Sequence, residues 1–272
     1  MGLRHQGLID DYYLPLFFFL YKQVTAAPAT PFFAGINAPQ GAGKSMLAGH
    51  LVRLFAWCDL KAVTLSIDDF YLTYKQQIHI AGENPENTFL QQRGYPGTHD
   101  IALGVEILSR LKDPQADPAI SLPRYDKSKY QGQGDRIDKD LWPSMQLPVD
   151  VVILEGWMLG FQPLPEDHVP DAQLHKINAL LQDYEHWDRF LDCFVYIHPE
   201  DPGFVVEWRC EAEERMKATG VTGMSLTEVR RYAEKFLPAY KLYGPHLLEC
   251  LPPVSSFLKI EIGRNRLPLS RS

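Results

Sequence analysis

The chain has 272 residues and a mass of 31.1 kDa, and its 45% hydrophobic and 22% charged residues are typical of a soluble globular protein. The 27 Lys and Arg residues against 34 Asp and Glu residues give a net charge of −7, which argues against a protein that recruits nucleic acid or anionic membrane through a general basic surface. The four cysteines form no C-x-x-C pair, so neither a disulfide framework nor a zinc site is expected.

An apolar stretch, YYLPLFFFLY, occupies residues 12–21. It is too short to span a bilayer, contains Pro15 and follows Asp10 and Asp11 instead of a basic segment. We therefore expect a buried N-terminal helix, within a helical segment at 8–28, that is kinked at the proline. No organelle-targeting extension is recognisable, which favours a cytoplasmic location and no association with a membrane.

Five apolar runs rich in β-branched and aromatic residues predict buried strands at 31–36, 62–67, 149–155, 192–198 and 257–262. The run KSMLAGHLVRLFAWC between the first two has helical spacing. Continuous hydrophobicity indicates strands covered on both faces, and the order strand, helix, strand predicts a right-handed βαβ unit. The predicted fold class is α/β, with a mostly parallel five-stranded sheet and helices on both faces, in one domain over 1–272.

Two long segments connect these elements. The stretch 73–148 has many glycine and proline turn signals around one predicted helix, Ile101–Lys112, and we interpret it as an insertion that faces the substrate. The stretch 203–245 is predicted to form a helical lid and C-terminal region.

The stretch APQGAGKS follows the first predicted strand and leads into the predicted helix. Gly41 and Gly43 suit a loop whose backbone N–H groups surround phosphate oxygens, Lys44 suits the β- and γ-phosphates, and Ser45 suits Mg²⁺. Ala38 stands where the usual pattern has glycine, which adds only a methyl group if the backbone there does not need a positive φ. The candidate nucleotide-binding residues are Pro39, Gln40, Gly41, Ala42, Gly43, Lys44, Ser45 and Met46.

Carboxylates follow two other predicted strands. Asp68 and Asp69 come directly after the second strand and Glu155 ends the third, so all three are expected at the edge where parallel strands end. An isolated Asp pair is more often a solvated turn or a helix cap, but the position behind a phosphate loop favours a function. The set predicts phosphoryl transfer, with Mg²⁺ held by Ser45, Asp68 and Glu155.

This order of motifs resembles the P-loop small-molecule kinases related to uridine kinase, phosphoribulokinase and bacterial pantothenate kinase. The resemblance rests on the glycine-rich loop, the D-x-F-Y pattern after the next strand and E-G after a later one. It implies that Asp68 is the catalytic base and that Asp69 fills a variable position. Lys44 at the phosphate loop and Glu155 at its strand end are the other predicted catalytic residues.

Two stretches bear on the acceptor. QQRGYPGTHD contains Arg93 and His99, and PRYDKSKYQGQGDR contains a basic patch in an acidic protein, which fits a small anionic substrate. A structural histidine and solvated loop lysines are the alternatives. The patch consists of Arg124, Lys127, Lys129 and Arg136.

Taken together, APQGAGKS, SIDDFYLT, QQRGYPGTHD, PRYDKSKYQGQGDR, VVILEGWMLGF and GMSLTEVRRYAEKFLPAYKLY resemble the plant-type D-glycerate 3-kinase family over residues 8–262. The APQG form of the loop belongs to that family's pattern. The resemblance implies that ATP, Mg²⁺ and D-glycerate are used to make 3-phosphoglycerate, a step of photorespiratory salvage. Tyr125 carries over from the P-x-Y-D pattern of uridine kinases, whose tyrosine lines the sugar pocket. The candidate substrate-binding residues are Asp69, Tyr71, Arg93, His99, Arg124 and Tyr125.

A lid that excludes water is expected, and EWRCEAEERMK at 207–217 is the candidate, with Arg209 and Arg215 placed to stabilise the transferring charge. The alternative is a surface helix in which Glu211 pairs with Arg215 four residues on. The segment Thr227–Phe236 is predicted to be a structural amphipathic helix.

Two alternatives to glycerate phosphorylation stay open on the sequence. One keeps the chemistry and changes the acceptor to pantothenate or uridine. The other is a P-loop ATPase or nucleotide-gated module without a small-molecule acceptor. A monomer is the favoured state, and no nucleic-acid partner is expected because the chain lacks a basic stripe or stacking platform.

Overall fold

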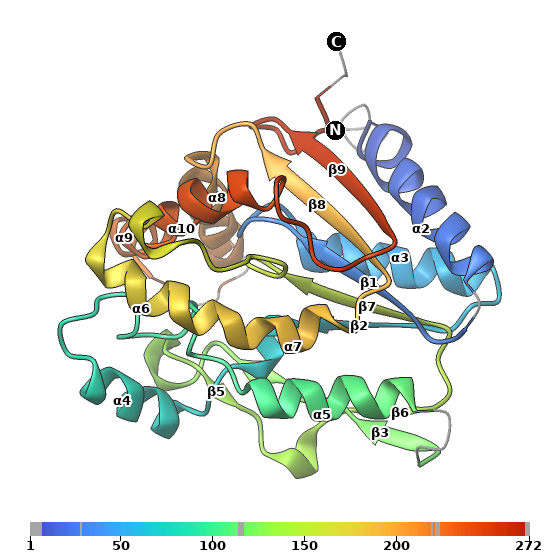
Figure 1. Ribbon diagram of the computed structural model, residues 1–272, viewed down its shortest axis with the longest axis horizontal. Coiled ribbons are helices and arrows are strands. Elements are labelled where there is room, and N and C mark those ends of the chain that lie inside the picture. Colours follow the sequence, from blue (N-terminus) through green and yellow to red (C-terminus); the bar gives the residue numbers. More distant parts are fainter. Residues whose placement is uncertain (1–6, 28, 114–116, 219, 221–223, 270–272) are drawn as a thin grey trace.

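The computed structural model describes residues 7–27, 29–113, 117–218, 220 and 224–269. At its centre lies a parallel sheet of five strands in the order β2-β7-β1-β8-β9 (Figure 1). The predicted five-stranded α/β fold is confirmed, and every strand end lies within two residues of its predicted position. The strands are β1 (Phe32–Asn37), β2 (Ala62–Ser66), β7 (Val151–Gly156), β8 (Cys193–Pro199) and β9 (Ser256–Ile262).

Burial distinguishes the central strands from the edge strands. All residues of β1 and β7 are buried, because their alternate side chains enter two separate hydrophobic cores, Phe33 in one and Phe32 in the other. The prediction of five buried strands is wrong for the two edges of the sheet. In β2 burial alternates, and β9 is mostly half-buried, with Lys259 and Glu261 on a strand that has a neighbour on one side only.

Helices cover both faces of the sheet. One core includes buried residues of α2 and α3, and the other includes buried residues of α5, α6 and α10. The helix predicted between the first two strands is α3, and the predicted helix Ile101–Lys112 is α5. The helices are α2 (Leu14–Ala26), α3 (Lys44–Trp57), α4 (Tyr74–Glu83), α5 (Ile101–Lys112), α6 (Ala172–Leu180), α7 (Glu185–Asp188), α8 (Phe204–Ala218), α9 (Leu226–Glu234) and α10 (Leu237–His246).

Short elements complete the chain. Two small antiparallel pairs join β3 (Ala119–Ser121) with β6 (Ser144–Gln146) and β4 (Tyr125–Asp126) with β5 (Asp135–Arg136). The single turns are the π-helical η1 (Ile9–Tyr13) and the 3₁₀ turns η2 (Ile67–Phe70), η3 (Tyr130–Gly132), η4 (Lys139–Leu141), η5 (Glu166–His168) and η6 (Leu181–Tyr184).

In the described part of segment 73–148 there are two α-helices, where the sequence predicts one. The missed helix is α4, whose ten residues have little net hydrophobicity. Its start carries a capping box, in which the Thr73 hydroxyl accepts a hydrogen bond from the Gln76 N–H and the Gln76 side chain accepts one from the Thr73 N–H. That T-x-x-Q signal was present in the sequence.

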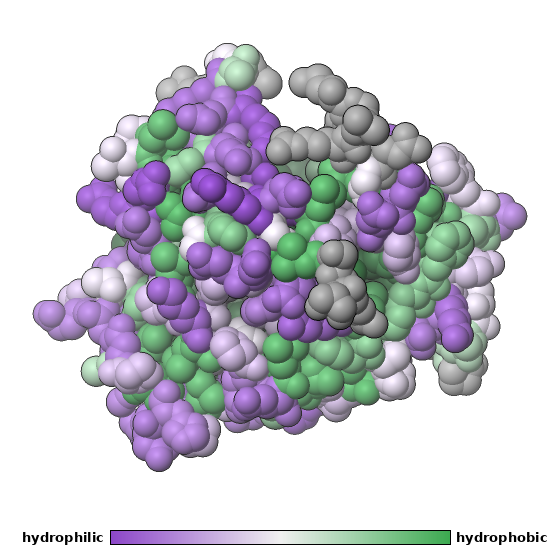
Figure 2. All heavy atoms as spheres, turned by 90° about the horizontal axis from the view of Figure 1, so that it is seen from above, coloured by the Kyte–Doolittle hydropathy of each residue, from purple (hydrophilic) through white to green (hydrophobic). Residues whose placement is uncertain are grey.

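The predicted N-terminal helix is confirmed as α2, which begins with Pro15 in its first turn and follows the π-helical turn η1. Figure 2 shows hydrophobic residues gathered at the end of the molecule where α2 and α3 lie in Figure 1. Phe18 of α2 is 61% exposed. Within the described part of the chain, no helix has the length and apolarity needed to cross a membrane. The predicted end at residue 28, and residues 219 and 221–223 of the predicted lid region, lie outside the described residues.

Candidate active site

The phosphate loop links β1 to α3. Gly41 and Gly43 have φ values of +80° and +92°, the left-handed region that glycine adopts without strain. A Cβ at Gly41 would lie 2.6 Å from the Cβ of Trp208, so this position also needs glycine for close packing. Ala38 is fully buried and is not among the described residues with positive φ, which confirms that the loop tolerates alanine there.

Residues from the C-terminal part of the chain hold this loop. The Gln40 N–H donates a hydrogen bond to the Tyr240 hydroxyl at 3.0 Å, and Arg266 Nε donates one to the Gly41 carbonyl at 2.9 Å. The Arg266 guanidinium also lies over the Trp208 ring, 5.2 Å from its centre. The sequence analysis missed all three of these side chains. For Arg266 a signal existed, because it follows β9, whose carboxyl end opens on the same edge of the sheet.

The register of the sheet brings Glu155 to the phosphate loop. Glu155, in β7, pairs with Ile36 of β1 on one side and with Ser66 of β2 on the other. Its Oε1 accepts a hydrogen bond from Ser45 Oγ at 2.9 Å, and the side chain is only 3% exposed. Its second oxygen, Oε2, is buried and has no hydrogen-bond partner among the residues described.

This pair fits a magnesium site. Mg²⁺ in kinases is held by one or two oxygen ligands from the protein together with phosphates and water, so a dedicated cage is not required. In the described ranges no three His, Cys, Asp or Glu side chains are grouped closely enough to form such a cage. The unpartnered oxygen of Glu155 and the neighbouring Ser45 hydroxyl are the two protein ligands that a phosphate-bound Mg²⁺ would use.

Asp68 lies in the 3₁₀ turn η2 directly after β2, where its N–H donates to Ser66 Oγ at 3.3 Å. Its Oδ2 accepts a hydrogen bond from Lys127 Nζ at 2.6 Å, and this contact is also an ion pair. Burial raises the pKa of Asp68, but the ammonium groups of Lys127 and Lys44 outweigh it and hold that pKa below its usual value. Asp68 is therefore ionised at neutral pH.

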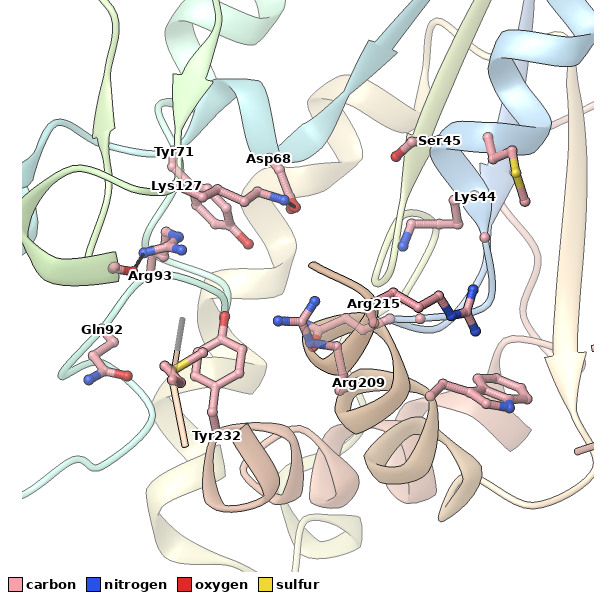
Figure 3. A pocket seen from close by; sticks show the side chains of 18 of the residues that line it. Lys44, Ser45, Asp68, Tyr71, Gln92, Arg93, Lys127, Arg209, Arg215 and Tyr232 are labelled. Atoms are coloured by element: carbon pink, nitrogen blue, oxygen red, sulfur yellow. Dashed lines mark hydrogen bonds and ion pairs between the residues drawn. The ribbon is translucent and has the colours of Figure 1, made fainter. Parts of the chain in front are cut away.

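A cavity of about 420 Å³ joins these groups. Figure 3 shows Asp68 and Lys127 on one side of it and Lys44 and Ser45 on the other. The predicted site residues that line it are Gln40, Gly41, Gly43, Lys44, Ser45, Met46, Asp68, Tyr71, Arg93, Glu155, Arg209 and Arg215. Of the residues that the structure describes, six predicted ones do not line it: Pro39, Ala42, Asp69, His99, Arg124 and Tyr125.

Asp69 and Arg124 contact each other. Arg124 donates from its guanidinium to Asp69 Oδ2 at 3.0 Å, and the Tyr125 N–H donates to the other carboxylate oxygen at 3.2 Å. Burial raises the pKa of Asp69, and the charge of Arg124 opposes that rise. These contacts connect strand β4 to the turn that carries Asp68, so they hold that turn in position.

His99 packs behind the cavity. Its ring stacks on Tyr71 with centres 4.3 Å apart, and its Nδ1 lies 2.7 Å from the Tyr184 hydroxyl. The side chain is 5% exposed, and burial lowers the pKa of His99 to about 3, so it is neutral at physiological pH. Tyr71, in contrast, lines the cavity and also contacts the Tyr125 ring, with centres 5.3 Å apart.

Arg93 lines the cavity and holds the basic loop. Its guanidinium donates hydrogen bonds to the carbonyls of Gly132, at 2.8 Å, and Gln133, and it lies over the Tyr125 ring, 5.5 Å from its centre. These contacts connect the stretch that follows α4 to the loop between β4 and β5.

The predicted lid helix is α8. Figure 3 shows Arg209 and Arg215 reaching from it toward the cavity that Lys44 and Asp68 line. The Glu211–Arg215 pair expected for a surface helix is also present, at 2.9 Å, and closure of this helix as a lid stays a prediction. Helix α9, predicted as structural, buries Val229 and Ala233 but also contributes Tyr232 to the cavity.

A parallel sheet whose first strand leads into a glycine-rich loop, with Lys44, a Ser45–Glu155 pair and Asp68 on one edge, defines a P-loop kinase. The chain is 40% identical over 284 residues to the chloroplastic D-glycerate 3-kinase of Arabidopsis thaliana, a match that covers 99% of this chain and 62% of that protein. Its structure matches D-glycerate 3-kinase from Cryptococcus neoformans var. grubii with a TM-score of 0.84 and 30% identity, over 95% of this chain and 97% of that one. The chain belongs to the D-glycerate 3-kinase family.

Further comparisons agree with this placement. The uncharacterized kinase mug58 of Schizosaccharomyces pombe is 34% identical over 263 residues, covering 92% of this chain and 94% of that protein. The chain thus spans nearly the whole yeast relative but less than two thirds of the plant one. No family model matches the chain.

Proposed function

We propose that this protein transfers the γ-phosphate of ATP to the 3-hydroxyl of D-glycerate. The observation that carries the proposal is the meeting of Lys44, the Ser45–Glu155 pair and Asp68 around one cavity. A lysine and a hydroxyl at the phosphate loop suit the nucleotide, and a carboxylate across the cavity suits a hydroxyl acceptor. The names of the Arabidopsis and Cryptococcus relatives support D-glycerate as that acceptor.

In this mechanism Asp68 orients the acceptor hydroxyl and takes its proton. The hydroxyl oxygen forms a bond to the γ-phosphorus while the bond to the ADP oxygen breaks, so that the products are 3-phosphoglycerate and ADP. Lys44 neutralises charge on the phosphate oxygens, and the backbone N–H groups around Gly41 and Gly43 cradle them. Mg²⁺, held by Ser45 and Glu155, would supply further charge neutralisation on the phosphates when bound.

Helix α8 would close over the nucleotide. Arg209 Nε is buried and lacks a hydrogen-bond partner within the described part of the chain, so this N–H is available to an anion. The Arg215 side chain is 70% exposed and is free to move between Glu211 and a phosphate. Closure of such a helix would exclude water from the γ-phosphate.

We also propose that the protein works as a cytoplasmic monomer and acts on a small molecule, without a nucleic-acid partner. One chain supplies the phosphate loop, the Ser45–Glu155 pair and Asp68, which are the groups that the proposed reaction uses. The four cysteines are free, and free cysteines are typical of proteins that work in a reducing compartment. Size-exclusion chromatography with light scattering would test the monomer.

The first experiment is ADP release with ATP and Mg²⁺, measured with and without D-glycerate, with pantothenate and uridine as alternative acceptors. D-Glycerate-dependent turnover that yields 3-phosphoglycerate is expected. Turnover with another acceptor would keep the kinase and overturn the substrate. ADP release that no acceptor stimulates would indicate an ATPase.

A further inference from the structure

The Lys and Arg side chains around the cavity differ in their hydrogen-bond and ion-pair partners. Arg93 donates to two loop carbonyls, and Arg266 donates to the phosphate loop and forms an ion pair with Glu211 at 2.8 Å. Lys127 instead contacts Asp68 itself, with 2.6 Å between Nζ and Oδ2. The Lys127 side chain is 57% exposed and comes from the loop between β4 and β5, so it can move without disturbing the core.

We propose that Lys127 binds the carboxylate of the acceptor, and that it releases Asp68 in order to do so. The proposal rests on the proposed function and deepens it, because it assigns the residue that recognises an acidic acceptor. Arg124, which the sequence placed among the candidate substrate-binding residues, is paired with Asp69 and does not line the cavity.

The size of the acceptor supports Lys127. In D-glycerate one carbon separates the carbon that bears the 3-hydroxyl from the carboxyl carbon, so the hydroxyl and carboxylate oxygens lie roughly 3–5 Å apart, judged from ordinary bond lengths. A hydroxyl that contacts Asp68 therefore brings its carboxylate close to the group that Asp68 already contacts. That group is the ammonium of Lys127.

The movement of Lys127 from Asp68 to the acceptor carboxylate would link acceptor binding to the release of the catalytic base. While Lys127 is bound to Asp68, its ammonium occupies Oδ2 of the carboxylate that would accept the proton of the hydroxyl. An incoming carboxylate competes for the ammonium and leaves Asp68 free beside the hydroxyl. A neutral alcohol or water has no charge with which to compete, so Lys127 favours acids over neutral acceptors.

The test compares wild-type enzyme with Lys127→Met, which removes the charge but keeps a similar length. Turnover is measured with D-glycerate and with its neutral amide, D-glyceramide. For Lys127→Met we expect the KM for D-glycerate to rise about 10- to 100-fold, as for loss of a charge-assisted hydrogen bond. The preference for the acid over the amide should fall by a similar factor. Lys127→Arg, which keeps a cation, should retain most of that preference.

Lys129→Met is the matched control, because Lys129 lies on the same loop but does not line the cavity. It should leave both KM values unchanged, and an equal effect would assign the preference to the charge of the loop as a whole. Affinity for an ATP analogue, measured by calorimetry, should be the same in all variants. A wild-type enzyme with no D-glycerate-dependent turnover would overturn the proposed function. A wild-type enzyme that is active, with Lys127→Met keeping its KM and its preference for the acid, would overturn this inference alone.

Discussion

The Ser45 hydroxyl and the Glu155 carboxylate lie 2.9 Å apart, although 110 residues separate them in the chain. The strand order explains this contact, because β7 lies between β1 and β2. Glu155 therefore ends β7 between the strand that leads to Ser45 and the strand that leads to Asp68. One crossover in the sheet thus places the nucleotide side and the acceptor side of the site next to each other.

Glu155→Gln should lower kcat about 10- to 100-fold, because it removes the charge that would hold Mg²⁺ while preserving the shape of the side chain. The amide oxygen of this variant could still accept the hydrogen bond that Ser45 donates to Glu155. We expect the rate to recover in part at raised Mg²⁺, so initial rates over a Mg²⁺ titration are the measurement.

Glu261→Gln is the control for that charge, since Glu261 is an exposed glutamate on the edge strand β9. Its Mg²⁺ titration should overlay that of the wild type. If Glu155→Gln does so too, Glu155 does not hold the metal.

Asp68→Asn should reduce turnover about 10²- to 10⁴-fold, as expected for loss of a general base. Nucleotide binding should survive, because Lys44 and the phosphate loop are unchanged. Single-turnover phosphorylation and binding of an ATP analogue measure the two effects separately. Asp59→Asn, at an exposed position with φ of +57° that asparagine adopts readily, should behave as wild type. Full activity of Asp68→Asn would remove Asp68 as the base.

The sequence predicted the parts of the site that strands position. Strand ends are readable from apolar runs, and in a parallel sheet they converge on one edge, which is why Lys44, Asp68 and Glu155 were found. Lys127 was noticed only as one charge of a patch, because its contact with Asp68 depends on how the loop between β4 and β5 folds back. Such loop conformations depend on tertiary contacts, here those of Arg93 with the Gly132 and Gln133 carbonyls, which no local pattern encodes.

The helix α4 was missed for a different reason. Its sequence, YKQQIHIAGE, buries one residue, Gln77, so it lacks the apolar stripe on which helix prediction relies. For the two edge strands, the sequence predicted the strand but not its burial. Hydrophobic runs identified β2 and β9 as strands, but a local pattern does not show whether a strand lies at the centre or at the edge of the sheet.

Gly41→Ala should destabilise the protein by about 1–3 kcal/mol, because the residue has φ of +80° and the new methyl group would meet Trp208. Gly49 is the matched control, a glycine at which alanine is expected to stabilise the protein. It lies within α3, and a Cβ there would contact nothing within 4 Å. Gly49→Ala should therefore stabilise by about 0.5–1 kcal/mol. Urea unfolding of both variants measures the difference, and equal effects would contradict the conformational argument.

Asp188 should make stability depend on pH. The side chain is 1% exposed, its Oδ2 accepts a hydrogen bond from Gln162 at 2.9 Å, and its Oδ1 has no partner among the described residues. Burial raises the pKa of Asp188 to about 7 from its ordinary 3.8. The folded protein therefore holds this proton at pH values where the unfolded chain has released it.

The sign of the effect follows from that difference. Because the folded state binds more protons between about pH 4 and pH 7, this group lowers the free energy of unfolding as pH rises through that window, by up to about 4 kcal/mol. Asp188→Asn removes the charge and keeps an acceptor for Gln162, so its advantage over wild type should grow from pH 5 to pH 8. Urea midpoints at both values measure this. Asp183→Asn, an exposed neighbour in the same segment, should follow the wild type. Parallel pH profiles for wild type and Asp188→Asn would mean that Asp188 is already ionised in the folded protein at pH 5.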